Sequence, residues 1–224
     1  MQHCTMRRNT VRDGFKCSGG ALMVSGASAA ELVDTELSSN VAIGGRNGAF
    51  GGAISVLDGA DLRLKQSTLA RNVADGNNED SSFVCGGAVF ISGEGSVGEV
   101  RESEIVDNVA GAALTFSQGG AVSVEKGARL LLTRSKVNRN VAEGGNYTFI
   151  PAAGAIYLEW AAAGEIVDCE LLENVVRGGK YANAGIAPHS RPCVSSPLHS
   201  TTDVRRCCHL TFCIQVRWVL LGRD

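Results

Sequence analysis

Residues 101–111, RESEIVDNVAG, bring three carboxylates close together: Glu102, Glu104 and Asp107. Paired carboxylates are what most enzymes use to cleave glycosidic bonds, one as acid and the other as base or nucleophile. Two cations that follow in the sequence, Arg134 and Lys136, could assist by binding a uronate or acting as a base. These five residues are the candidate surface site of the chain. What they can do depends on the elements that position them.

Those elements belong to a repeat. Segments of the type GGA start at residues 19, 51, 86 and 119 (GGALMV, GGAISV, GGAVFI and GGAVSV), and AGAIYL at 153 is a degenerate copy. At nearly constant offset, each is followed by an asparagine: Asn40, Asn72, Asn108, Asn140 and Asn174. The segment MRRNTV near the start matches the end of one more copy. We therefore expect a partial repeat at 1–18 and full repeats over 19–186.

Each repeat reads as β structure. Apolar residues alternate with others after each glycine pair, as at Ile54 and Val56, and a second alternating run such as DLRLKQS follows. Three short strands with turns fit into each repeat of roughly 33 residues, which is too short for a helical crossover. The sequence predicts an all-β fold, a right-handed parallel β-helix solenoid of about five rungs. Residues 187–224 break the pattern and should form an irregular tail, either a cap or mis-called sequence.

In such a solenoid, equivalent residues stack about 4.8 Å apart as ladders. Three positions before each asparagine stands an apolar residue, and five positions before stands a small one. The asparagines themselves can bond to one another, because a side-chain amide offers two donors and an acceptor. We therefore interpret Asn40, Asn72, Asn108, Asn140 and Asn174 as a structural ladder rather than as ligands.

The combination of GGA[IVL] with [LIV]xxN resembles the repeat of chlamydial polymorphic outer-membrane proteins, over roughly residues 4–186. In that family the second element is FxxN, and here Leu, Ile or Val replaces the phenylalanine. The resemblance implies a right-handed β-helix on a cell surface that acts in adhesion. It favours an extracellular or cell-surface location, although the first residues show no apolar stretch of signal-peptide length.

The outward charges alternate in sign from rung to rung. Glu102, Glu104 and Asp107 form an acidic rung, and Arg134, Lys136 and Arg139 form the basic rung that follows. Opposite charges at rung spacing attract, whereas stacked like charges repel. We interpret the carboxylates mainly as register control between rungs. The alternative, a calcium-assisted or acid–base site on a polysaccharide lyase or glycosidase, stays open.

The loops between repeats are the better candidates for binding. They are rich in Gly and Asn, vary in length, and carry an aromatic residue near the next glycine pair: Phe15, Phe50, Phe83, Phe116, Phe149 and Tyr181. These aromatics could cover the edge of the core or form a strip that binds carbohydrate or a cell-surface protein.

Composition narrows the remaining classes. A formal net charge of -2 gives no footprint for nucleic acid, and no apolar run is long enough for a transmembrane helix. We predict no catalytic, cofactor or metal site. The leading hypothesis is a non-enzymatic segment of a larger surface or extracellular protein, with an adhesion or scaffold role. The alternatives are a carbohydrate-active β-helix enzyme and a nonfunctional gene fragment, which sequencing of the transcript across both ends would distinguish.

Overall fold

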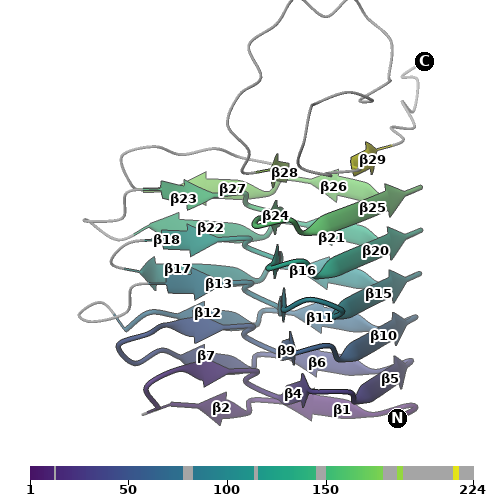
Figure 1. Ribbon diagram of the computed structural model, residues 1–224, viewed down its shortest axis with the longest axis horizontal. Coiled ribbons are helices and arrows are strands. Elements are labelled where there is room, and N and C mark those ends of the chain that lie inside the picture. The colour runs from purple at the N-terminus through teal and green to yellow at the C-terminus, as the bar shows by residue number, and fades with distance from the viewer. Residues whose placement is uncertain are drawn as a thin grey trace, which may run out of the picture.

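The computed structural model describes residues 1–12, 14–77, 83–113, 116–144, 150–178, 186–188 and 214–216, and their regular elements are all strands. The chain coils upward from the N-terminal end, and strands from successive turns lie directly above one another (Figure 1). All strand pairs that join successive turns are parallel, in five sheets. The predicted all-β parallel solenoid of about five turns is therefore confirmed.

Each turn visits the five sheets in a fixed order. The glycine sheet, which follows each glycine pair, contains β4 (Leu22–Ser25), β9 (Ile54–Leu57), β14 (Val89–Ser92), β19 (Val122–Glu125), β24 (Ile156–Leu158) and β28 (Ile186–Pro188). The long sheet contains β5 (Ala29–Val33), β10 (Asp61–Lys65), β15 (Val97–Arg101), β20 (Arg129–Thr133), β25 (Ala163–Val167) and β29 (Ile214–Val216). The charged sheet contains β1 (Thr5–Arg7), β6 (Glu36–Ser38), β11 (Thr68–Ala70), β16 (Glu104–Val106), β21 (Lys136–Asn138) and β26 (Glu170–Leu172).

The remaining two sheets follow the asparagines. The alanine sheet contains β2 (Thr10–Val11), β7 (Val41–Ile43), β12 (Val73–Asp75), β17 (Val109–Ala113), β22 (Val141–Gly144) and β27 (Val175–Arg177). The aromatic sheet contains β3 (Cys17–Ser18), β8 (Ala49–Phe50), β13 (Phe83–Cys85), β18 (Phe116–Gln118) and β23 (Ile150–Ala152).

A turn therefore has five strands rather than the three expected from the sequence. The two additional strands lie in segments that read as the end of the asparagine run and as loops, such as 43–50. Alternation is not visible there because strands of two or three residues are too short to display a period of two. Of the expected tail, the structure describes only β29 and residues 187–188 of β28, and the rest lies outside the described residues.

The main core fills the space enclosed by the glycine, long and charged sheets. Ladders of near-isosteric side chains run through it: Leu37, Leu69, Ile105 and Val137 of the charged sheet are all completely buried. A second, smaller core lies between the alanine and aromatic sheets and consists of Ala42, Ala49, Ala74, Val84 and Ala110. Small side chains let these two sheets approach each other closely.

Each glycine of the repeated pair is required for a different structural reason. Gly51 has a φ of +64°, a conformation that L side chains rarely adopt. A Cβ on Gly52 would lie 2.2 Å from the Gly87 carbonyl oxygen and 2.6 Å from the Val73 nitrogen. The second glycine therefore marks a close backbone contact both within its turn and with the next.

Candidate functional site

The candidate carboxylates lie on the outer face of the charged sheet, where they pair with the turn above. Glu104 and Lys136 are register partners, with 3.7 Å between Oε1 and Nζ. Arg134 Nη2 donates to Glu102 Oε1 at 2.6 Å. Arg139 holds Asp107 with two hydrogen bonds, from Nε at 2.8 Å and from Nη2 at 3.0 Å. The structure thus joins four of the five predicted surface-site residues in two ion pairs, whereas Asp107 pairs with Arg139 at the other corner of the sheet.

These charges occupy the two corners of the charged sheet as well as its face. Residues six and one before each asparagine have positive φ values, between 46° and 57°. At one corner they are His3, Asp34, Gln66, Glu102, Arg134 and Asp168, and at the other Arg8, Ser39, Arg71, Asp107, Arg139 and Glu173. Non-glycine residues, most of them charged, therefore turn the backbone at positions where glycine would be the unstrained choice. The sequence pattern did not reveal this conformation.

The ion pairs shift the pKa values of the charged groups on this face. Hydrogen bonds from Arg139 lower the pKa of the Asp107 carboxyl; partial burial opposes this effect, and the charges of Arg139 and Arg71 add to it. The same contact raises the pKa of the Arg139 guanidinium. Glu102 and Asp107 thus each bind a side-chain cation of the basic rung, and their oxygens are not left open to coordinate a metal ion. No group of three or more metal-binding side chains occurs among the described residues.

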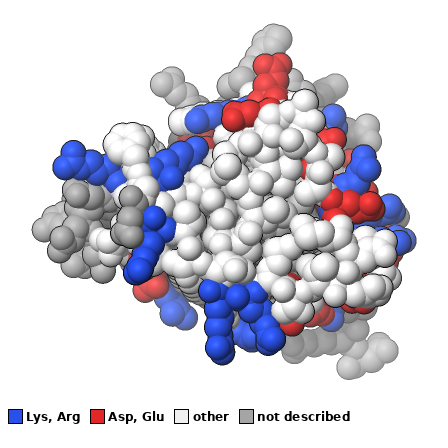
Figure 2. Space-filling view, turned by 90° about the horizontal axis from the view of Figure 1, so that it is seen from below, with Lys and Arg blue, Asp and Glu red and all other residues white. Residues whose placement is uncertain are grey.

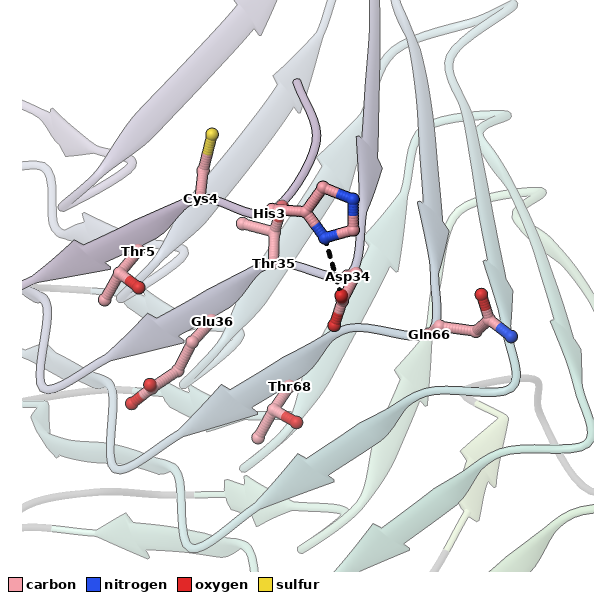
Figure 3. A pocket seen from close by; sticks show the side chains of 8 residues that line it. All are labelled: His3, Cys4, Thr5, Asp34, Thr35, Glu36, Gln66 and Thr68. Atoms are coloured by element: carbon pink, nitrogen blue, oxygen red, sulfur yellow. Dashed lines mark hydrogen bonds and ion pairs between the residues drawn. The ribbon is translucent and has the colours of Figure 1, made fainter.

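A shallow depression of about 360 Å³ lies at the lower end of the same face (Figure 3). An ion pair in it joins His3 Nδ1 to Asp34 Oδ2 at 2.7 Å, with both side chains largely exposed. Glu36 and Thr68 lie beside this pair on neighbouring strands. The depression is lined by His3, Cys4, Thr5, Asp34, Thr35, Glu36, Gln66 and Thr68. Sequence reasoning gave this end no special role, because its charges are sparser.

The asparagines are joined from turn to turn by a repeated hydrogen-bond unit. Asn72 Oδ1 accepts from the backbone N–H and from Nδ2 of Asn40, both at 3.0 Å. Asn72 Nδ2 donates to Asn108 Oδ1 at 2.9 Å and to the Leu37 carbonyl at 3.0 Å. The same pattern extends from Asn9 through Asn108 and Asn140 to Asn174. The side chains of Asn40, Asn72, Asn108 and Asn140 are wholly buried, so these four amides are not accessible to a ligand.

A second ladder runs parallel to the first, five positions before each asparagine. The backbone N–H of Ser67 donates to Ser103 Oγ, and that of Ser103 donates to Ser135 Oγ, both at 3.1 Å. The uppermost member is Cys169, whose Sγ accepts from the Ser135 N–H at 3.4 Å. Cys4, Cys17, Cys85 and Cys169 are all free thiols.

The loop aromatics that the structure describes do not form one continuous strip. Phe83 and Phe116 stack with ring centroids 5.4 Å apart, and Phe83 is 40% exposed. Phe50, by contrast, is buried and packs on Phe90 with centroids 4.8 Å apart, while Lys16 Nζ lies 4.6 Å from its ring. Phe15 is exposed. Phe149 and Tyr181 lie outside the described residues.

Phe90 and Phe50 belong to a buried polar region that sequence reasoning missed. The outward face of the glycine sheet is covered by the aromatic sheet, so Ser55, Phe90, Ser123 and Tyr157 are buried despite pointing away from the main core. Burial and the neighbouring Glu125 raise the pKa of the Cys85 thiol. Burial also raises the pKa of the Glu125 carboxyl. The signal in the sequence was the apolar Phe90 and Tyr157 at positions where alternation expects polar residues.

Comparisons with known proteins do not assign the chain to a family. No protein-family model, curated protein or solved structure shows significant similarity to the chain. Among the described residues, no helix is long and apolar enough to cross a membrane.

Proposed function

We propose that this chain is a non-enzymatic β-solenoid segment of a larger surface or extracellular protein, with a role in adhesion or as a scaffold. The observation that carries the proposal is the pairing of the candidate catalytic groups. Glu102, Glu104 and Asp107 each contact a cation of the next turn at 2.6–3.7 Å. A general acid or base must reach its substrate with a free proton position, and these carboxylates are instead engaged in holding turns together.

The resemblance of the repeat to chlamydial polymorphic outer-membrane proteins supports the same role. A stack of turns with a rigid core presents its connecting segments at regular spacing, which suits recognition of an extended partner. The stacked pair Phe83 and Phe116 offers an aromatic surface to a sugar ring or an apolar side chain. We therefore propose carbohydrate or a cell-surface protein as the partner, bound through the loops.

A glycan array read beside a uronate-cleavage assay tests this proposal. We expect retention of a glycan without product, and weaker retention after Phe83→Ala. The matched control Met23→Ala removes another exposed apolar side chain and should leave retention unchanged. Turnover that Glu104→Gln abolishes would overturn the non-enzymatic proposal.

One observation keeps the enzyme alternative in view. In the depression at the lower end, Glu36 has the neutral register partners Thr5 and Thr68, and Asp34 pairs with a histidine. A polysaccharide lyase or glycosidase would use Asp34 and Glu36 of this depression rather than the carboxylates that pair with Arg134, Lys136 and Arg139. Cleavage that Glu36→Gln abolishes and Glu104→Gln leaves intact would establish that alternative.

A further inference from the structure

The aromatic and glycine sheets enclose three chemically reactive side chains in the middle of the stack. Cys85 of β13, Gln118 of β18 and Glu125 of β19 are 1%, 5% and 6% exposed, respectively. Figure 2 views the lower end of the solenoid, where Lys, Arg, Asp and Glu side chains lie mostly along the rim of an uncharged central area. A thiol, a carboxamide and a carboxyl group buried together therefore differ from the exposed charges of the rim.

Cys85 and Gln118 lie directly above one another in the aromatic sheet. They are register partners on the adjacent parallel strands β13 and β18, whose backbones are about 4.8 Å apart. Cys85 Sγ lies 3.5 Å from Gln118 Oε1. The register partner below Cys85 is Phe50, and the one above Gln118 is Ala152. The nucleophilic thiol is therefore in contact with the carboxamide of the next turn, whose carbon is an electrophile.

Glu125 can carry a proton between these two groups. Its carboxyl is hydrogen-bonded to the Cys85 thiol, and Ser123 Oγ donates to its Oε1 at 3.4 Å. Burial raises the pKa of the Glu125 carboxyl, and burial together with Glu125 raises the pKa of the Cys85 thiol. The thiol therefore keeps its proton until a base removes it. A carboxylate whose pKa is raised is a stronger base than usual, and its protonated form can return the proton to a leaving group.

Apolar side chains shield the thiol from water. Cys85 belongs to a buried cluster with Phe50 and Phe90, whose rings pack with centroids 4.8 Å apart. Lys16 Nζ lies 4.6 Å from the centroid of the Phe50 ring. Water competes with any acyl transfer, because it hydrolyses the activated acyl group. Exclusion of water therefore favours an exchange between the thiol and the carboxamide over hydrolysis of its product.

We propose that Cys85 and Gln118 close to an internal thioester that joins two adjacent turns. Cys85 Sγ bonds to Gln118 Cδ, the bond from Cδ to Nε2 breaks, and the thiol proton passes through Glu125 to the leaving nitrogen, which departs as ammonia. The exchange is not a redox step. The link places Sγ, Cδ and Cγ between the two Cβ atoms, which suits a strand spacing of about 4.8 Å. This modification does not depend on the proposed adhesion or scaffold role, and its acyl group can be transferred to a primary amine.

Mass spectrometry of the full chain tests the proposal. We expect a mass lower by one ammonia than the sequence requires and, after digestion, a peptide containing Cys85 joined to one containing Gln118. Methylamine should open the link, which leaves N-methylated Gln118 and a Cys85 thiol that iodoacetamide labels. A chain of full mass, with Cys85 labelled after unfolding without prior methylamine, would overturn the proposal.

Four variants assign the roles within this group. Cys85→Ala and Gln118→Ala should each abolish the joined peptide, whereas Cys17→Ser, which changes another buried cysteine of the same sheet, should retain it. Samples taken at intervals after translation of the chain give the rate of closure, which Glu125→Gln should lower at least about a hundredfold. Loss of ammonia that persists in Cys85→Ala would refute the thioester, and an unchanged rate in Glu125→Gln would refute the proton transfer through Glu125.

Discussion

Removal of one ladder amide, in Asn72→Ala, should destabilise the solenoid more than most single substitutions. Asn72 is wholly buried, and its side chain makes four hydrogen bonds of 2.9–3.0 Å. The substitution leaves three buried groups without partners: the Asn40 N–H, an Asn40 Nδ2 proton and the Leu37 carbonyl. A group orphaned in this way costs about 1–3 kcal/mol. We therefore expect a loss of about 3–5 kcal/mol in the free energy of unfolding.

The matched control is Asn9→Ala at the lower end of the same ladder. Asn9 is exposed and makes only two hydrogen bonds with Asn40 Oδ1, one of them from its backbone N–H. The substitution therefore removes one solvent-accessible bond and should cost about 1 kcal/mol or less. Urea denaturation followed by circular dichroism measures both variants, and the m-value shows whether the stack unfolds as one unit. Equal losses for the two variants would refute the view that burial of the amide ladder stabilises the fold.

Three further predictions test the corners, the glycine pairs and the covered face. A carbon-detected NMR titration should show the pKa of Asp107 below its ordinary value. The stability that its pair with Arg139 contributes is therefore present above the pKa of the unfolded chain and is lost as the pH falls through the pKa of the folded chain. Arg139→Met should return the pKa of Asp107 to its usual range, and an unchanged pKa in this variant would contradict the pairing. Gly52→Ala should lower the free energy of unfolding by more than about 3 kcal/mol, because the new Cβ would lie 2.2 Å from a backbone oxygen that cannot move away. Gly111→Ala should be tolerated, because the nearest atom to its Cβ is a side-chain atom at 3.4 Å. Thermal unfolding compares the two variants, and equal losses would contradict the close backbone contact at Gly52. As a free thiol, Cys85 should resist a thiol reagent in the native chain and react after unfolding, because burial and the neighbouring Glu125 disfavour its thiolate. Mass spectrometry measures the labelling, and rapid labelling of the native chain would show that the aromatic sheet does not cover Cys85.

The architecture follows from the sequence because the repeat makes each local preference add to the next. Near-isosteric residues such as Leu69 and Ile105 at fixed offsets can all be buried at once only if the turns stack in register. The same register places Glu104 beside Lys136, so the ion pairs follow from spacing alone. The asparagine ladder was also predictable, because buried amides must find partners and the nearest candidates are other amides.

The sequence alone could not give the features that depend on how distant segments pack. Of the two additional strands in each turn, one was read as the end of the asparagine run and the other as loop, because strands of two or three residues show no period of two and are recognised only by their pairing with the next turn, as between Ala42 and Ala74. Coverage of the glycine sheet by the aromatic sheet, which buries Phe90 and Tyr157, likewise arises only once the chain has coiled. The left-handed corners at Glu102 and Asp107 are imposed by closure of each turn rather than by residue preference. Repetition thus determined the stack and its ladders, whereas the shape of each turn was decided by contacts between its non-neighbouring parts.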